Sequence, residues 1–289
     1  MEQITGQQIT GQQITRQQIT GRTRLLGIVG DPIAQVGSPR VCNARIAAAG
    51  VDAVLIPLHV PNAHFETAMA GLMRLGNLDG LLVTIPFKER VLALADTVRP
   101  VAKIIGAANA IRREADGSWT ADMFDGVGVV RVLAGLGVSI AGASVLLLGA
   151  GGAGRAIAVT LARAGAARIG LYDLDPSRTE ALVHRVTQAA PATQAIAATP
   201  MTSGYDIVIN ATPVGMQPND GLPAPLGNLA GVTAVIDIVP YPPITPLLTA
   251  AAQAGCRTSG GLAMIEGQAD AVLEFFGINT APTAAPAHP

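Results

Sequence analysis

The sequence predicts an α/β protein in two parts, each with strands and helices that alternate along the chain. Short apolar runs of strand length recur between longer segments with helical spacing. This alternation restarts near the middle of the chain, between Asp125 and Ala143. The length of 289 residues also suits about two domains. Strands that alternate with helices imply parallel sheets built from β-α-β units.

The first half begins with a buried strand over Leu25–Val29, which Gly30-Asp31-Pro32 ends. The segments that follow are predicted to be a helix over Pro39–Ala49, a strand over Ala53–His59, a helix over Ala63–Leu75 and a strand over Gly80–Thr84. We expect a helix over Pro86–Ala95 as well, since proline suits the first helical turn. Short strands over Ala108–Arg113 and Trp119–Asp122 precede a helix over Gly126–Leu136, which leads into the second half.

The second half repeats the pattern. Its predicted elements are strands over Ala143–Leu148 and Arg168–Asp173, further strands near Thr193–Ala197, Asp206–Asn210 and Val232–Asp237, and helices over Gly152–Ala164, Pro176–Ala189, Thr245–Ala254 and Gly261–Phe276. The last helix is long and amphipathic. Periodicity leaves open whether this helix packs on the first half.

Composition and charge exclude several classes of function. The 19 Lys and Arg residues balance 20 Asp and Glu residues, so we expect no nucleic-acid partner and no binding to anionic membranes. Charged residues make up 13% of the chain and apolar residues 49%, which suits a large buried core. No apolar run reaches the ~18 residues of a membrane span, and no secretory signal is visible. We expect a cytoplasmic protein that is a monomer or homodimer.

Cysteine and histidine usage predicts neither a disulfide framework nor a metal site. The two cysteines, Cys42 and Cys256, are too few for such a framework. His59 and His64 have no cysteine or carboxylate cluster beside them. The chain begins with four copies of a five-residue Gln-Ile-Thr unit, so residues 1–23 are predicted to be a disordered leader. The Ala/Pro-rich residues 280–289 are predicted to be a loose tail.

A glycine-rich loop follows the strand that ends at Leu148 and opens the next helix. Its residues are Gly149, Ala150, Gly151, Gly152, Ala153 and Gly154, which fill a G-x-G-x-x-G pattern. In such loops the first glycine permits a tight turn, the second lets the backbone approach a pyrophosphate, and the third lets helix and strand pack closely. The helix N-terminus then presents free N–H groups to the phosphates. The loop predicts dinucleotide binding; the alternative is a glycine-rich turn that binds nothing.

Asp173 indicates which dinucleotide is used. It ends the next strand, 24 residues after Gly149. A carboxylate there accepts hydrogen bonds from the ribose 2′-hydroxyl and repels a 2′-phosphate, which favours NAD over NADP. The nearest cation is Arg178, five residues further on, and it is the feature that favours NADP, because a cation can bind a 2′-phosphate.

Polar residues of the first half are candidates for proton transfer, because hydride transfer from an alcohol also requires proton removal from its hydroxyl. They are Ser38, Thr84, Lys88, Asn109 and Asp125. Lys88 follows a strand at the sheet edge where such folds bind ligands, although a solvated helix lysine fits equally well. Asp125 also fits a helix N-cap, and Asn109 a turn cap.

Taken in order, these segments resemble the shikimate/quinate dehydrogenase family over about Gly27–Gly277. The motifs that carry the resemblance are Gly30-Asp31-Pro32-Ile33, Ser38-Pro39 with Asn43, Val83–Lys88, Gly106–Asn109, Asp125–Gly128, Asn210–Met216 and Gly261–Gln268. The resemblance implies a two-domain α/β fold with a split substrate-binding catalytic domain over 24–124 and 260–279. A Rossmann-like NAD-binding domain would cover 125–259.

The resemblance also implies residue roles. Lys88 and Asp125 would form the catalytic pair, with Lys88 accepting the proton during alcohol oxidation. Substrate would be bound by Ser38, Thr84, Asn109 and Gln268. The cofactor would be bound by Gly149, Ala150, Gly151, Gly152, Ala153, Gly154, Asp173, Asn210, Thr212, Pro213, Met216 and Gly261. The implied reaction is reversible hydride transfer between NAD and a ring hydroxyl of shikimate or quinate.

The chain departs from the family pattern where groups that bind the substrate carboxylate are expected. Val36 replaces a serine, Leu82 replaces an asparagine, Phe124 interrupts a polar run, and Pro240 replaces a tyrosine. One interpretation is that Arg40 or Tyr241 supplies the missing contact and the substrate is a cyclic hydroxy acid. The others are a paralogue that acts on a different cyclic polyol, and a cofactor-binding sensor without catalysis.

Overall fold

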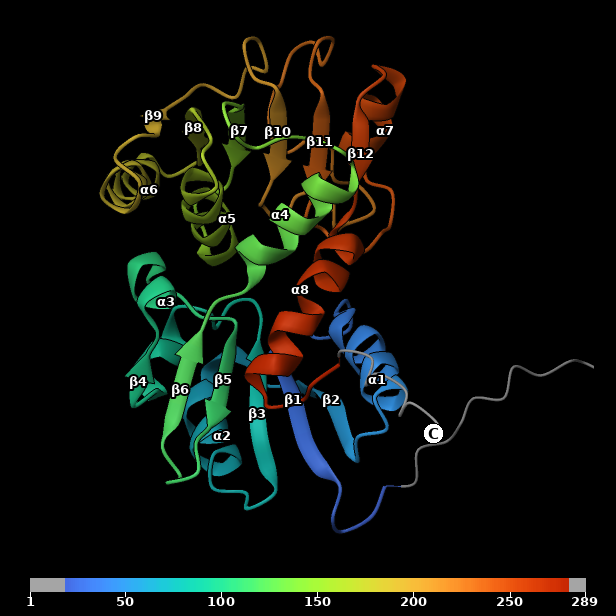
Figure 1. Ribbon diagram of the computed structural model, residues 1–289. Coiled ribbons are helices and arrows are strands. Elements are labelled where there is room, and N and C mark those ends of the chain that lie inside the picture. Colours follow the sequence, from blue (N-terminus) through green and yellow to red (C-terminus); the bar gives the residue numbers. More distant parts are fainter. Residues whose placement is uncertain (1–18, 281–289) are drawn as a thin grey trace, which may run out of the picture.

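The computed structural model describes residues 19–280 and contains two six-stranded sheets with helices around and between them (Figure 1). The predicted leader and tail lie mostly outside these residues. Within the leader, the N–H of Thr23 donates to the carbonyl of Thr20 at 3.1 Å, which closes a turn. No helix within 19–280 is long and apolar enough to cross a membrane.

The first sheet has the strand order β2-β1-β3-β5-β6-β4. Its strands are β1 (Arg24–Gly30), β2 (Ala53–His59), β3 (Leu78–Val83), β4 (Thr97–Val98), β5 (Ala110–Arg113) and β6 (Trp119–Asp122). β1 runs parallel to β2 and β3, but β5 is antiparallel to β3 and β6. The expectation of a parallel sheet is therefore confirmed for β1, β2 and β3 and for the β4–β6 pair, and is wrong for β5. A short hairpin joins β5 to β6, and only antiparallel neighbours accept so short a connection.

The helices of this half are α1 (Ser38–Ala48), the 3-10 turn η1 (Asn62–His64), α2 (Phe65–Leu72), the 3-10 turn η2 (Arg90–Leu94) and α3 (Pro100–Ile105). The predicted helix over Pro86–Ala95 is wrong, since the chain forms a turn there before η2. Buried Phe87 stacks on Phe65 with ring centroids 4.2 Å apart. The carbonyl of Lys88 accepts from the N–H of Ala108 at 2.8 Å, a tertiary bond in place of a helical one.

The second sheet has the order β12-β11-β10-β7-β8-β9 and is parallel throughout, as predicted. Its strands are β7 (Ser144–Leu148), β8 (Arg168–Tyr172), β9 (Gln194–Ala197), β10 (Ile207–Asn210), β11 (Ala234–Asp237) and β12 (Arg257–Ser259). α5 (Gly152–Arg163), α6 (Pro176–Ala189) and α7 (Pro246–Gln253) connect them. The sheet therefore has the topology of a doubly wound nucleotide-binding fold.

Two helices join the halves. α4 (Asp125–Gly135) leads from the first sheet to the second, and α8 (Gly261–Phe275) returns beside it (Figure 1). The end of α8 packs on β3, because a Cβ added at Gly80 would lie 2.5 Å from the Phe276 ring. The question that periodicity left open is thus answered: α8 returns to the first half.

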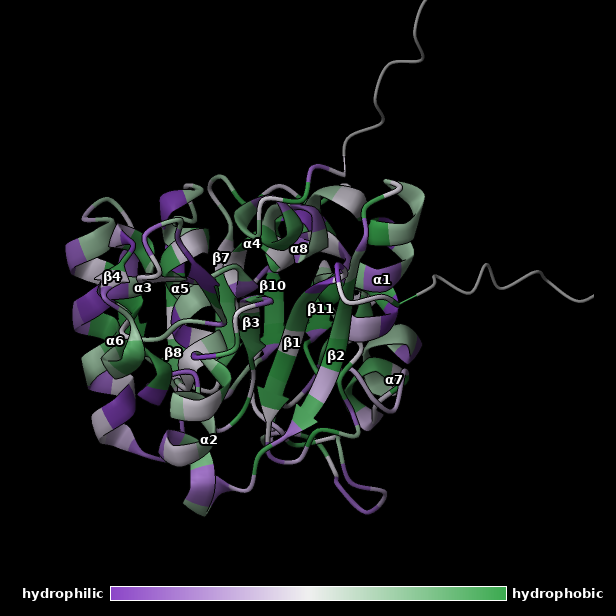
Figure 2. Cartoon of the chain, turned by 90° about the horizontal axis from the view of Figure 1, so that it is seen from below, coloured by the Kyte–Doolittle hydropathy of each residue, from purple (hydrophilic) through white to green (hydrophobic). Residues whose placement is uncertain are grey.

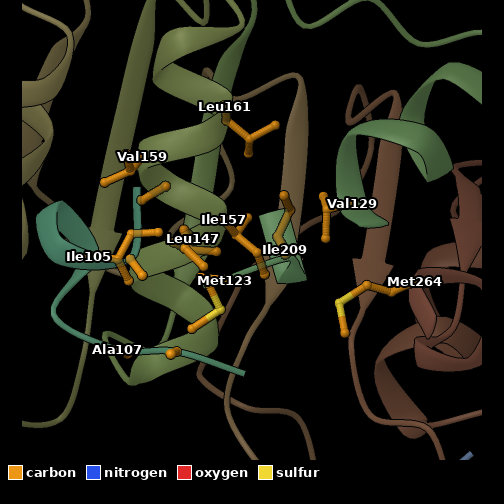
Figure 3. Packing of buried hydrophobic residues seen from close by; sticks show 14 of the residues in the cluster. Ile105, Ala107, Met123, Val129, Leu147, Ile157, Val159, Leu161, Ile209 and Met264 are labelled. Atoms are coloured by element: carbon orange, nitrogen blue, oxygen red, sulfur yellow. The ribbon is translucent and has the colours of Figure 1, made fainter. Parts of the chain in front are cut away.

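A single apolar cluster spans the two halves. It includes Met123, which follows β6, Leu147 from β7 and Ile157 from α5, which lie close together in Figure 3. Alternate β7 residues serve different faces, since Val145 belongs to this central cluster and Leu146 to an outer one. Viewed from below, apolar residues dominate the strands, while polar residues gather on outer helices such as α6 (Figure 2). The shared cluster fixes how the strand ends of the two sheets face each other.

Candidate active site

A cavity of about 530 Å³ lies where the two halves meet. Its walls come from the ends of β1 and β3, the start of α1, the glycine-rich loop, the segment after β10 and one face of α8. Carboxyl ends of parallel strands are where open α/β sheets bind ligands. Of the predicted site residues, those that line the cavity are Ser38, Thr84, Lys88, Asn109, Asp125, Gly149, Gly151, Gly152, Ala153, Asp173, Thr212, Pro213, Met216 and Gln268.

The floor of the cavity carries an ion pair. The Lys88 Nζ donates to the Asp125 Oδ2 at 2.5 Å, and the two side chains are 14% and 2% exposed. Asp125 is the first residue of α4, and Phe124 takes the N-cap position. The N-cap interpretation of Asp125 therefore fails, and its carboxylate is free to pair with Lys88. The positive end of the α4 dipole further stabilises the charged carboxylate.

Asn109 extends this pair into a chain of side-chain hydrogen bonds. Its Nδ2 donates to the Asp125 Oδ1 at 2.7 Å and to the Gln268 Oε1 at 3.0 Å. Its Oδ1 accepts from the N–H of Phe124 at 2.9 Å. All the hydrogen-bonding groups of the Asn109 side chain are thus satisfied in a buried position, which holds the network rigid. Gln268 reaches the network from α8, so the last helix completes the site.

Ser38 and Thr84 place hydroxyl groups beside the network. Ser38 is the buried first residue of α1. Thr84 directly follows β3, and its N–H donates to the Val29 carbonyl at 2.9 Å. Both residues line the same cavity as Lys88. Together with Gln268, they give a set of uncharged polar groups that matches a polyhydroxylated ligand.

The glycine-rich loop between β7 and α5 has the close approaches that its pattern predicts. Gly149 has a φ of +97°, a conformation that suits glycine. A Cβ at Gly154 would lie 1.9 Å from the Gly149 carbonyl oxygen, so Gly154 permits tight packing of the helix on the turn. A Cβ at Gly151 would meet nothing within 4 Å, which leaves backbone open beside the cavity. This cradle at a helix N-terminus fits a pyrophosphate.

Asp173 and Arg178 line the cavity, and Asp173 contacts the glycine-rich loop. The Asp173 Oδ2 accepts from the Ala150 N–H at 2.7 Å, and its Oδ1 accepts from the Asp175 N–H at 2.9 Å. Arg178 is exposed and lies 3.6 Å from Asp175, measured between its Nε and Oδ2. The cavity lining thus holds a carboxylate and a cation five residues apart in the sequence.

Four predicted site residues are not part of the cavity lining: Ala150, Gly154, Asn210 and Gly261. Asn210 is buried, and its Oδ1 accepts from the N–H of Thr212 at 3.0 Å. This bond holds the chain segment that follows β10. Its Nδ2 donates to Asp237 at 2.9 Å, and burial raises the pKa of that carboxyl group. A Cβ at Gly261 would lie 2.2 Å from the Ile238 carbonyl oxygen, which indicates a packing requirement.

Several apolar lining residues were not among the predicted site residues. Ile28, Val36, Leu82 and Ile265 line the cavity and belong to one apolar cluster, which we call the apolar wall. Only Val36 and Leu82 stood out in the sequence, as departures from a family pattern. Apolar side chains carry no chemical signal of their own, so only the fold reveals that the four converge.

The two residues expected to restore a substrate contact do not reach the cavity. Arg40 is exposed on α1, and Tyr241 is 65% exposed; neither lines the cavity. Within residues 19–280, no group of three or more His, Cys, Asp or Glu side chains is arranged to hold a metal ion. The charged side chains in contact with the polar network are Lys88 and Asp125.

The family model and the curated relative that match this chain share one family description. Residues 28–111 match a family model described as the shikimate dehydrogenase substrate binding domain. The chain is 37% identical over 265 residues to shikimate dehydrogenase (NADP(+)) from Geobacter metallireducens, covering 89% of this chain and 92% of that protein.

Two solved structures are similar over nearly the whole chain. A ligand-free 5-ketofructose reductase of Gluconobacter sp. strain CHM43 has a TM-score of 0.77 and 34% identity, covering 89% of this chain and 94% of that one. Shikimate 5-dehydrogenase from Listeria monocytogenes, in complex with shikimate and NAD, has a TM-score of 0.78 and 30% identity, covering 90% and 93%.

Proposed function

The chain belongs to the shikimate dehydrogenase family, and from that premise we propose that it catalyses reversible hydride transfer between NAD and a secondary hydroxyl of a small polyhydroxylated ring compound. An oxidoreductase of this family uses a pyridine nucleotide. The choice of NAD, the substrate and the residue roles are our proposals.

The observation that carries the proposal is the Lys88–Asp125 pair in the cavity. A buried ion pair rarely adds net stability compared with apolar residues of similar size, so its presence beside a ligand cavity favours a chemical role. Lys88 also adjoins the nucleotide cradle, because a Cβ at Gly152 would lie 3.2 Å from the Lys88 Cβ. The pair thus stands between the candidate substrate and cofactor sites. A protein that only binds the cofactor as a sensor would not need it.

Lys88 moves the proton in this proposal. For oxidation, the Lys88 ammonium first releases one proton to water. The resulting amine then takes the hydroxyl proton of the substrate while the hydride leaves the same carbon. The adjacent Asp125 carboxylate stabilises the ammonium that forms. During reduction, the ammonium returns the proton to the developing alkoxide. Asn109 holds the Asp125 carboxylate in place, and Ser38, Thr84 and Gln268 orient the hydroxyl groups of the substrate.

The glycine-rich loop and the segment after β10 would hold the cofactor, which accepts or donates the hydride when bound. Gly151, Gly152 and the α5 N-terminus suit its phosphates. Asp173 supports NAD, since its carboxylate disfavours a 2′-phosphate. The Listeria relative was solved with NAD, whereas the Geobacter relative is named for NADP(+). Residues 24–124 and 260–279 would bind the substrate, and residues 125–259 the cofactor.

Initial rates of NADH formation test this proposal. The full chain is assayed with shikimate, quinate and uncharged cyclic polyols, each beside an NADP control. We expect turnover with at least one compound and faster turnover with NAD. Tight NADH binding without turnover of any compound would instead support the sensor interpretation.

Reduction of a keto sugar is a second candidate function. The apolar wall favours it, since that wall offers no partner for a ring carboxylate. Its support from the comparisons is the 34% identity to the protein described as a 5-ketofructose reductase. The same assay, run in reverse with 5-ketofructose and either NADH or NADPH, distinguishes the two candidates. A cytoplasmic location and a monomeric or homodimeric state stay predictions.

A further inference from the structure

We propose that the substrate of this site is uncharged: a polyhydroxylated alcohol or ketone that has no carboxylate. This inference rests on the proposed function and names the substrate class. It is carried by the charges and the apolar residues around the cavity.

The cations of the cavity lining are already paired. Within the described residues, Lys88 and Arg178 are the cationic side chains that line the cavity. Lys88 pairs with Asp125 at 2.5 Å. Arg178 pairs with Asp175 at 3.6 Å. An anionic substrate that reaches Lys88 therefore meets no unpaired cation beside it.

The acidic side chains of the lining are Glu89, Asp125 and Asp173. Glu89 pairs with Arg155, Asp125 pairs with Lys88, and Asp173 accepts from the N–H groups of Ala150 and Asp175. The lining beside the polar network therefore has no excess of positive charge to attract a substrate carboxylate. The nucleotide phosphates do not need one, because the α5 N-terminus offers them backbone N–H groups.

The apolar wall lies directly beside the polar network. Ile28 on β1 pairs in register with Leu82 on β3. Val36 precedes α1, and a Cβ at the next residue, Gly37, would lie 3.1 Å from the Ile265 side chain. Ile265 is three residues before Gln268 on α8, so the two share a helix face. A substrate held by Gln268 would therefore place part of its ring against this wall.

A carboxylate against the apolar wall would lose its water without replacement partners. Burial of an unpaired charge is strongly unfavourable, whereas burial of ring carbon is favourable. Ser38 and Thr84 are the hydroxyl residues nearest this wall in the sequence, and two hydroxyls supply two donors to a group with about four acceptor sites. An uncharged ring satisfies both surfaces: its hydroxyls bond the polar network, and its carbon face packs on the wall.

The test compares shikimate with its methyl ester, which keeps the ring and its hydroxyls but removes the charge. Equilibrium binding of each compound is measured by calorimetry with NADH present, and initial rates are measured with NAD. We expect the ester to bind at least roughly 10-fold more tightly than the acid, the effect of about one charge-assisted hydrogen bond. Equal binding, or tighter binding of the acid, would overturn the inference.

Variants of Val36 test the same point in the opposite direction. Val36→Thr adds a hydroxyl with little change in shape, and Val36→Ala is its matched control that only adds space. We expect Val36→Thr, but not Val36→Ala, to shift the ratio of affinities toward the acid. An unchanged ratio in both variants would contradict a role for the apolar wall.

The two proposals fail in different ways. Preferential binding of the ester, with no turnover of any compound in either assay, would support the uncharged class and overturn the dehydrogenase reaction. Turnover with preferential binding of the acid would support the reaction and overturn the uncharged class. Binding of neither compound to the NADH complex would overturn the inference, because it predicts that a ring with these hydroxyls fits the site.

Discussion

At the scale of single residues, Lys88 carries the most specific prediction. Lys88→Met keeps the apolar stem and removes the amine that exchanges the proton. We expect kcat to fall by about 10²- to 10⁴-fold, the usual contribution of a positioned acid or base. NADH affinity, measured by fluorescence titration, should change little. Lys103→Met is the matched control, since Lys103 is the only other lysine of the chain and is exposed on α3.

An unchanged kcat in Lys88→Met would remove Lys88 from the proposed mechanism.

The identity of the polar residues could be predicted from the sequence, but their connections could not. Lys88 and Asp125 are 37 residues apart, and Asn109 and Gln268 are 159 apart. Such pairs depend on how the two sheets dock, and no local pattern encodes that.

Asp173 and Arg178 together predict the cofactor preference. Asp173→Ala removes the carboxylate that opposes a 2′-phosphate, so the ratio of kcat/KM for NAD to that for NADP should fall about 10-fold. Arg178→Ala should shift this ratio the other way, or leave it unchanged. The ratio is the proper readout, because Asp173 also accepts from Ala150 and its loss alters the loop for both cofactors. A constant ratio in Asp173→Ala would place Asp173 outside the ribose site.

At the scale of elements, two glycines of the glycine-rich loop allow helix packing and cofactor binding to be tested separately. Gly154→Ala forces a Cβ to within 1.9 Å of the Gly149 carbonyl, so both the Tm and NADH affinity should fall. Gly151→Ala meets no protein atom within 4 Å, so we expect the Tm to be kept while NADH affinity falls. Gly71→Ala on α2 is the control, where added space is also open and affinity should not change. Wild-type affinity in Gly151→Ala would contradict a phosphate position at this loop.

The elements that could be predicted were those with long or alternating apolar patterns. β7, α5 and β8 follow from strand-length apolar runs around a glycine pattern. The segment over Pro86–Ala95 was predicted to be a helix because proline often occupies the first helical turn. It forms a turn instead, since Phe87 stacks on Phe65 and the Lys88 carbonyl accepts from the N–H of Ala108. α3 is too short for a periodic signal, although Pro100 and the left-handed Gly106 mark its two ends. β12 has three residues and exists only through pairing with β11.

At the scale of the whole molecule, the two halves could be predicted, but not the core that they share. The restart of the alternation near Ala143 marks the second half. The central cluster joins Val29 and Leu81 of the first sheet to Val145 and Ile209 of the second. Each of these residues reads in sequence as an ordinary buried strand position. The outer clusters, by contrast, hold Cys42 on the first half and Cys256 on the second.

These two thiols predict how the molecule unfolds. Burial raises the pKa of the Cys42 thiol to about 12 and also raises that of Cys256. Because the thiolate is the reactive form, neither should react with a thiol reagent in the native protein at mildly alkaline pH. The central cluster couples the halves, so we expect both thiols to become reactive over the same urea range, in one cooperative transition. Cys42→Ala and Cys256→Ala allow each thiol to be followed alone. If Cys256 reacts at clearly lower urea than Cys42, the second half opens independently, and the shared cluster contributes less to stability than the geometry implies.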